Sequence, residues 1–150
     1  MQAKSKLVAE KIHLVEFRLL KGHIDSPFEF NYEDIREHSF DVELEIGFNL
    51  ADKMLKAEIR FKISTCSNDE NATEASGDFI LAYIFHIENM EELVHENDKG
   101  LTIDIGLGNA IASISYSTSR GILLTRFQGT ALRNFILPVM NPNHLLKKND

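Results

Sequence analysis

The chain has little cysteine, no long hydrophobic run and fewer basic than acidic residues, and each shortage excludes a class of protein. A single cysteine, Cys66, excludes an internal disulfide and a Cys-rich zinc site. Lys and Arg number 16 against 23 Asp and Glu, and the net charge of -7 argues against general binding of nucleic acids or anionic membranes. No run approaches membrane-spanning length, and charges interrupt any signal-peptide core, so we expect a cytoplasmic protein that does not insert into membranes.

The remaining composition is that of an ordinary globular domain. The 150 residues are 43% hydrophobic and 26% charged, which is enough apolar chain for a real core. No stretch has the composition of a disordered region. We therefore expect a single domain over residues 1–150.

Four segments with the two-residue periodicity of β-strands precede the helical part of the chain, at residues 11–20, 41–49, 55–63 and 79–87. In the first, the apolar positions change parity after Leu14, which predicts a β-bulge. The second and third have one apolar and one charged face, which is typical of a solvent-exposed sheet surface and requires no catalytic role. The fourth is apolar on both faces, so we expect part of the outer surface to be covered.

A long segment, residues 22–39, connects the first two predicted strands and exceeds the length of a hairpin turn. It carries three aromatic residues spaced by two, Phe28, Phe30 and Tyr32. We interpret it as a crossover loop that bears aromatic side chains. Strands that come first and helices that come last are the order of an α+β domain with an antiparallel sheet, rather than of alternating βαβ units.

The stretch from Leu107 to Pro142 begins with a helical portion that has two apolar stripes. One stripe comprises Ile111, Ile114, Thr118, Ile122 and Thr125, and the other comprises Ala112, Tyr116, Ser119, Leu123 and Phe127. A helix that is buried on two sides needs two partners. We expect one stripe on the chain's own sheet, and we assign the second stripe to an interface with another subunit. A fully buried helix in a monomer is the alternative.

Both ends of this long helix carry residues with known capping preferences. Asn109 is expected to cap its start, and Gly129 is expected to end it. Ser113, Ser117 and Arg120 form its polar face. The segment after the helix is apolar and irregular.

Several short motifs around the long helix occur together in one known family. Gly129-Thr130, followed by Leu137-Pro138-Val139 and Asn141, is similar to the segment after the long helix in that family. Leu107-Gly108 is similar to the pair before the helix, and residues 83–87, YIFHI, are similar to the last strand. These residues resemble the SecB family of protein-export chaperones. The order of four strands, crossover loop and terminal helices also agrees, so the resemblance covers residues 11–146.

The resemblance implies an export chaperone that needs neither ATP nor a cofactor and that holds unfolded preproteins in apolar grooves for the SecA motor. It also implies a homotetramer that is built as a dimer of dimers. The client-binding positions that it implies are Phe28, Phe30, Tyr32, Phe135, Val139 and Met140. The matching motor-contacting positions are Glu16 and Asp78, whereas a further acidic position of the family is Leu20 here. The alternatives are ordinary core residues for the first set and solvated carboxylates for the second.

The sequence departs from the family's pattern after Asn141-Pro142. Only NHLLKKND follows, so the second helix of the family is expected to be reduced to a turn or two. We also expect the protein to lack the zinc-binding tail that contacts SecA in typical members of the family. Holding of clients therefore fits the residues better than dedicated delivery to SecA. A SecB-like chaperone that guards an antitoxin is an open alternative.

No pattern of catalytic or metal-binding residues supports an enzyme. The six histidines are scattered over unrelated segments, and the pair His86 and His95 lacks the His-Glu-x-x-His arrangement of a zinc protease. Gly106 and Gly108 precede Ile111, where a dinucleotide-binding motif requires Gly or Ala. The serines of the helix alternate around it without a nucleophile elbow. We therefore expect no enzymatic activity and no metal site, and the rival class is a carrier of a small apolar ligand or a structural adaptor on the same fold.

Overall fold

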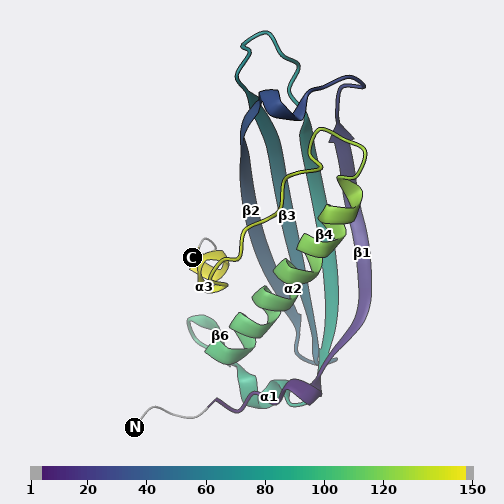
Figure 1. The fold of residues 1–150 in the computed structure, drawn as a ribbon. Helices are drawn as coiled ribbons and strands as arrows, with labels where there is room; N and C mark the ends of the chain where they lie inside the picture. Colours follow the sequence, from purple (N-terminus) through teal and green to yellow (C-terminus); the bar gives the residue numbers. More distant parts are fainter. Residues whose placement is uncertain (1–4, 148–150) are drawn as a thin grey trace.

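A computed structural model describes residues 5–147 of the chain and shows an α+β architecture in which one long helix crosses a sheet (Figure 1). The strands are β1 (Ile12–Asp25), β2 (Ile35–Asn49), β3 (Met54–Ser67), β4 (Ser76–Ile87), β5 (Val94–Asn97) and β6 (Gly100–Ile103). The helices are α1 (Met90–Leu93), α2 (Ile105–Arg126) and α3 (Asn143–Lys147), with short 3-10 turns at Ala9–Lys11 and Tyr32–Asp34. The prediction of an α+β fold is confirmed.

The four long strands form one antiparallel sheet in the order β1-β4-β3-β2, so the chain crosses from one edge to the other between β1 and β2. A crossover segment is therefore confirmed, but it is shorter than predicted. β1 continues to Asp25, which pairs with Ser76, and β2 begins at Ile35, which pairs with Ser67. The prediction of a loop over residues 22–39 was wrong at both ends, because the backbone of the flanking residues completes the ladders with β4 and β3.

β1 contains two β-bulges, which confirms the irregularity predicted from its change of parity. The register with β4 shifts between Leu14 and Glu16 and again between Leu19 and Lys21. Each bulge inserts one extra residue, so side chains change faces while the pairing continues. As a result, Leu14, Phe17 and Leu19 all stand opposite residues of β4 that face α2.

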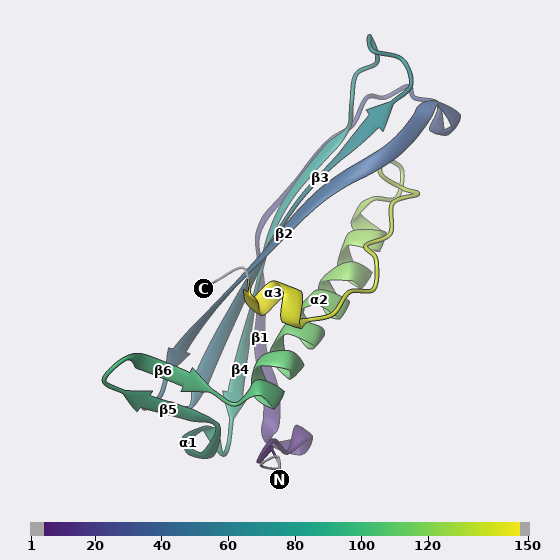
Figure 2. The same ribbon diagram turned by 90° about the vertical axis from the view of Figure 1, so that its left-hand side faces the viewer.

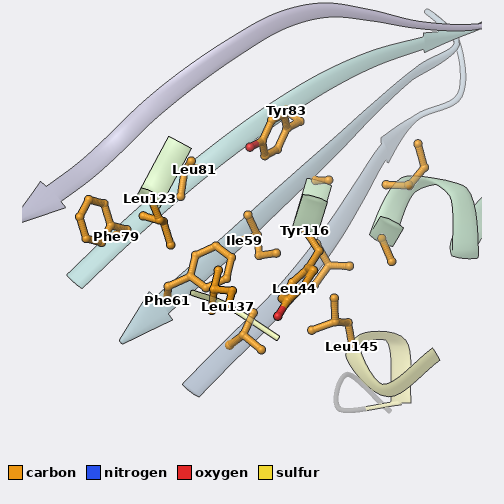
Figure 3. Close-up of a cluster of buried hydrophobic side chains, with 14 of the residues drawn as sticks. Leu44, Ile59, Phe61, Phe79, Leu81, Tyr83, Tyr116, Leu123, Leu137 and Leu145 are labelled. Carbon is orange, nitrogen blue, oxygen red and sulfur yellow. The ribbon is translucent and has the colours of Figure 1, made fainter. Parts of the chain in front are cut away.

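Helices α2 and α3 both lie on one face of the sheet, and neither covers the opposite face (Figure 2). The covered face packs into the hydrophobic core drawn in Figure 3, which includes Leu44, Phe61 and Tyr83. On the open face, Ile80 and Ile84 of β4 are half-buried. Charged residues of β1 and β3 stand opposite them, and the methylene stems of such side chains shield apolar atoms. The expectation that both faces of β4 are buried is therefore met only in part.

The N-terminal cap of α2 differs from the prediction. The Oδ1 atom of Asp104 accepts hydrogen bonds from the backbone N–H groups of Gly106 at 2.9 Å and Leu107 at 3.2 Å, so Asp104 is the N-cap. The prediction that Asn109 caps the helix was wrong, because an aspartate caps as well as an asparagine and Asp104 comes earlier in the chain. The end of the helix agrees, since Gly129 follows it with a φ of 79° that favours glycine.

The stripe of α2 that we assigned to another subunit is the one that packs on the chain's own sheet. Its members are at most 4% exposed: Ala112, Tyr116, Ser119, Leu123 and Phe127. The hydroxyl of Ser119 shares a 2.8 Å hydrogen bond with the hydroxyl of Tyr83 inside the core. The assignment of this stripe to a subunit interface was therefore wrong, because these side chains have no surface left for a second chain.

The other stripe faces away from the sheet except at Ile111, which is fully buried. Ile114, Thr118 and Thr125 are exposed, and Ile122 is half-buried. Both stripes repeat with the same helical period, so periodicity alone could not tell which of them contacts the sheet. These four residues, which we call the outward stripe of α2, form the side of the helix that is open to another subunit.

Candidate functional site

The crossover segment and the segment that follows α2 meet near one end of the sheet (Figure 1). Phe30 and Tyr32 of the crossover pack edge to face, with ring centroids 4.8 Å apart. The hydroxyl of Tyr32 donates a 2.9 Å hydrogen bond to the carbonyl oxygen of Thr130, and the guanidinium of Arg133 lies 4.7 Å from the centre of the Tyr32 ring. Two segments that are far apart in the sequence therefore form one continuous surface.

We call the segment between α2 and α3, residues 127–142, the connecting segment, and it has side chains both on the core side and on the solvent side. Phe135 is 8% exposed, and its ring lies 5.1 Å from that of His38 and 5.6 Å from that of Phe40. Ile136 and Val139 instead point to solvent, with exposed fractions of 60% and 87%. The connecting segment therefore closes the core with one set of side chains and presents another set to the outside.

The six residues predicted to bind clients differ in exposure. Two are almost fully exposed, Phe28 at 98% and Val139 at 87%; three are half-buried, Phe30, Tyr32 and Met140; and one, Phe135, is buried. Phe30 and Met140 pack against the core and Phe135 belongs to it, whereas Phe28 and Val139 are open to solvent. The binding of clients by all six residues stays a prediction. Ile136, which is 60% exposed, was missed, because the irregular sequence after α2 gives no signal of which apolar residues point outward.

A groove of about 100 Å³ separates α2 from the connecting segment and α3. The wall contributed by α2 is polar and contains the predicted polar face of the helix, Ser113, Ser117 and Arg120. The opposite wall is apolar and contains Val139, Met140, Pro142 and Leu145. Tyr116 also lines the groove, and its hydroxyl donates a 2.5 Å hydrogen bond to the carbonyl oxygen of Pro138, which ties the connecting segment to the helix.

His38 of β2 lies under the connecting segment, where its ring stacks on Phe135 at an interplanar angle of 28°. Its Nε2 atom is buried and has no hydrogen-bond partner in the part of the chain that the structure describes. Burial lowers the pKa of His38 below its ordinary value of 6.5, because the charged imidazolium loses its hydration. The neutral imidazole is therefore the form that fits beneath Phe135.

We expect the protein to lose stability as the pH falls from 6.5 toward the lowered pKa of His38. In this window the unfolded chain binds a proton that the folded chain does not, so the free energy of unfolding rises with pH and the contribution of His38 is complete above pH 6.5. Urea unfolding above and below this pH measures the slope. His38→Leu should flatten it, whereas His23→Leu, at an exposed histidine of β1, should leave the His38 part in place. A slope that His38→Leu does not change would contradict this origin.

The two carboxylates predicted to contact a motor lie on the open face of the sheet, but they are well separated. Ile84, which pairs with Glu16, is about 20 Å along β4 from Asp78 at the usual rise of a strand. Glu16 forms a 2.7 Å ion pair with Arg18, and Asp78 forms one of the same length with Lys21. A hydrogen bond from Lys21 holds the pKa of Asp78 below its ordinary value. Each carboxylate therefore has a partner within the chain, and their role in motor contact stays a prediction.

A further exposed apolar surface lies on β1, on the same side of the sheet as α2. Leu14 is 48% exposed, Val15 52% and Phe17 42%, although Leu14 and Phe17 stand opposite core residues of β4. β1 is an edge strand, so one side of its backbone pairs with no other strand of residues 5–147. An apolar edge strand of this kind is typical of a surface that another chain covers.

The sheet also brings together two histidines that are distant in the sequence. His13 and His86 are cross-strand neighbours with ring centroids 6.3 Å apart, and the Nε2 atom of His13 lies 2.7 Å from the Oε1 atom of Glu88. Within residues 5–147, however, no group of three or more His, Cys, Asp or Glu side chains is arranged to hold a metal ion.

The helices of this part of the chain also include none that is long and apolar enough to cross a membrane.

Comparison with known proteins identifies a fold. No family model and no curated protein matches the sequence. The solved structure of a SecB-like chaperone of Mycobacterium tuberculosis, Rv1957, in complex with a ChAD peptide from the HigA1 antitoxin Rv1956, is similar with a TM-score of 0.61. The two chains are 14% identical, and the similarity covers 88% of this chain and 92% of the other. The four-stranded antiparallel sheet and the long helix of this protein therefore form a SecB-like fold.

Proposed function

We propose that the protein is a chaperone that holds extended or unfolded polypeptide segments without ATP, cofactor or enzymatic activity. The observation that carries the proposal is the set of exposed apolar side chains on the crossover and connecting segments, Phe28, Ile136 and Val139. These side chains add little to the core of the single chain, so their burial is left for a partner. Burial of apolar area contributes about 25 cal/mol per Å², less the ordering cost of the client, so several weak contacts suffice without sequence preference.

Replacing Phe28 and Val139 together by serine is expected to weaken client binding at least tenfold. Both side chains are almost fully exposed, so the change removes client contacts and leaves the core intact. Full burial of one such side chain contributes roughly 1.5–3 kcal/mol, and about 1.4 kcal/mol corresponds to a factor of ten. The turbidity of an aggregation-prone protein diluted from denaturant, with increasing amounts of each variant, measures the effect. Replacing Phe30 and Tyr32 as well would disturb their mutual packing and confuse the readout.

The matched control is Leu101→Ser on β6, because Leu101 is 45% exposed and lies outside the crossover and connecting segments. This variant should protect the client as well as the unchanged protein does. If the Phe28 and Val139 variant protected equally well, these residues would not belong to the site. If the unchanged protein left the client to precipitate, the chaperone proposal itself would fail.

A chaperone of one antitoxin is the second candidate function. It is favoured by the similar fold of the SecB-like chaperone that was solved with an antitoxin peptide. An export chaperone binds many unrelated unfolded preproteins, whereas an antitoxin chaperone selects one segment. Titration with a panel of unfolded proteins, in parallel with peptides from an antitoxin, separates the two. Comparable affinity for the whole panel supports export, and tight binding of a single peptide supports the antitoxin role.

A carrier of a small apolar ligand is less well supported by the shape of the surface. The groove beside α2 measures about 100 Å³, and a hollow beside the crossover segment, lined in part by Phe30, measures about 220 Å³. Sites for small molecules usually enclose roughly 300–1,000 Å³. These two hollows accommodate single side chains of a polypeptide better than a whole ligand. Two larger hollows, of about 440 and 520 Å³, lie along the sheet, and most of the residues that line them are charged or polar, which suits an apolar ligand poorly.

The proposal includes assembly into a homotetramer, built as a dimer of dimers, in the cytoplasm. The surfaces that we assign to subunit contacts are the outward stripe of α2 and the exposed residues Leu14 and Phe17 of β1. The outward stripe carries two isoleucines and two threonines, the β1 surface is apolar, and both lie on the α2 side of the sheet. A dimer of dimers needs two kinds of interface, and two such surfaces on each subunit meet that need.

Glu16 and Asp78 are our proposed contacts for a SecA-like motor. To contact the motor, Glu16 must give up its ion pair with Arg18, and Asp78 must give up its ion pair with Lys21. Exposed ion pairs contribute only about 0–1 kcal/mol of stability, so the exchange costs little. A contact of this kind should weaken as salt screens the charges. Titration with purified SecA at low and high salt tests it. Absence of binding, or binding that salt does not change, would contradict a contact through these carboxylates.

A further inference from the structure

The charges of this acidic protein are unevenly distributed along the chain. Residues 105–147, which include α2, the connecting segment and α3, contain four Lys or Arg and no Asp or Glu. The whole chain nevertheless has a net charge of -7. The layer that covers the sheet is therefore a basic part of the molecule, and it favours acidic over basic partners.

Arg120 is the cation of this layer that lines the groove between α2 and the connecting segment. Arg133 is engaged with the ring of Tyr32, and Arg126 is exposed at the C-terminal end of α2. Arg120 is half-buried, and within residues 5–147 it has no ion-pair partner. Withdrawal of a guanidinium from water is unfavourable unless a carboxylate pairs with it, so Arg120 is placed to take a carboxylate from a ligand.

The other groove residues complement Arg120. Ser113 and Ser117 are exposed and stand one helical turn apart on the same wall, so their hydroxyls add hydrogen-bond donors beside the guanidinium. The opposite wall offers apolar contact through Val139. Burial raises the pKa of the Tyr116 phenol, and the charge of Arg120 acts in the opposite direction, which places the guanidinium within electrostatic range of the groove. One wall of the groove thus carries a positive charge and hydrogen-bond donors, and the other wall is apolar.

We propose that this groove binds an extended polypeptide segment in which an Asp or Glu carboxylate pairs with Arg120 and a neighbouring apolar side chain packs on Val139 and Met140. The planar fork of N–H donors in arginine matches the two oxygens of a carboxylate. The volume of about 100 Å³ is right for side chains and too small for an enclosed small molecule. The inference rests on the proposed function, because it names the chemistry of the client segment.

Three fluorescently labelled peptides test the inference. They share one apolar sequence and differ at a single central position, which is Glu, Gln or Lys, and anisotropy titration gives their affinities. We expect the unchanged protein to bind the Glu peptide about tenfold more tightly than the Gln peptide, and the Lys peptide most weakly, because charge-assisted hydrogen bonds are the stronger ones. Arg120→Glu should reverse this order. Arg120→Lys keeps the charge but loses the planar fork, so it should retain a reduced preference for Glu.

Arg126→Glu is the matched control, because it makes the same change of charge on an exposed part of the same helix. Since Arg126 does not line the groove, this variant should keep the order of affinities of the unchanged protein. Circular dichroism and thermal unfolding establish that each variant is folded. A preference for the Glu peptide that survives Arg120→Glu, or that Arg126→Glu abolishes equally, would overturn the assignment of Arg120.

The outcomes also separate this inference from the function on which it rests. If the unchanged protein binds the Gln and Glu peptides equally, or binds none of the three while it still keeps a denatured client soluble, the inference fails and the chaperone proposal stands. If it binds no peptide and protects no client, both fail. Displacement of the Glu peptide by dodecanoate would assign the groove to a small amphipathic acid and would overturn its assignment to a polypeptide.

Discussion

Replacing Phe61 by alanine is expected to lower the free energy of unfolding by about 3–5 kcal/mol. Phe61 is 0% exposed, comes from the inner strand β3 and lies 6.2 Å from the ring of Tyr116 on α2. Truncation removes apolar contacts between sheet and helix and leaves a cavity that the paired strands on both sides cannot fill. Urea unfolding followed by circular dichroism measures the change, at one fixed protein concentration because assembly adds to apparent stability.

A charge reversal on the open face of the sheet is the control for this experiment. Glu45 stands directly opposite Glu58 in the β2–β3 ladder, so Glu45→Lys converts a pair of like charges into a pair of opposite charges. We expect it to stabilise the protein by about 0.2–1 kcal/mol. A cost for Phe61→Ala no larger than the effect of the control would contradict the central place of Phe61 in the core.

Replacing Phe17 and Ile114 together by glutamate is expected to convert the assembled protein into a monomer. Phe17 belongs to the edge strand β1 and Ile114 to the outward stripe of α2, and they are 42% and 37% exposed in the single chain. An ionised carboxylate that is buried without a partner is strongly unfavourable, and in a symmetric assembly the change recurs in every copy of the interface. Light scattering across a size-exclusion peak should give a multiple of 17.1 kDa for the unchanged protein and 17.1 kDa for the variant.

Leu101→Glu serves as the control for the assembly experiment, because Leu101 of β6 is 45% exposed but belongs to neither proposed interface. This variant should keep the mass of the unchanged protein. A mass of 17.1 kDa for the unchanged protein would refute the assembly altogether. A variant that carries both glutamates and keeps the full mass would instead show that subunits meet through another surface.

The strands could be predicted because their alternation is a property of the sequence itself. Val42 and Leu44 lie two residues apart and are both buried, as a period of two requires of one face of a strand. The ends of the strands could not be predicted in the same way. Gly22 and His23 look like loop residues, yet they pair with Phe79 and Asp78 because the long β4 offers backbone partners to the end. Pairing between strands is non-local, and local composition does not reveal it.

The sequence indicated which two segments contain the candidate site, but it did not indicate which of their side chains are exposed. The aromatic residues of the crossover and the apolar residues after α2 were both selected from the sequence, and the hydrogen bond from Tyr32 to Thr130 shows that the two segments meet. Their sequence did not distinguish Phe135, which is buried against His38, from Val139, which is 87% exposed. In an irregular segment no period links one side chain to the next, so the tertiary contacts alone decide which residues point outward.

The sequence by itself determined the α+β class, the existence of the bulged first strand and the turn at Gly129 that follows α2, because each depends on local periodicity or on the backbone freedom of one residue. The tertiary structure alone decided which stripe of α2 lies on the sheet, which residue caps the helix and which cation lines the groove beside α2. Two stripes of similar composition are equivalent until a sheet covers one of them. A partner can reach the side chains that stay accessible after the helix has packed on the sheet, and Arg120 is one of them.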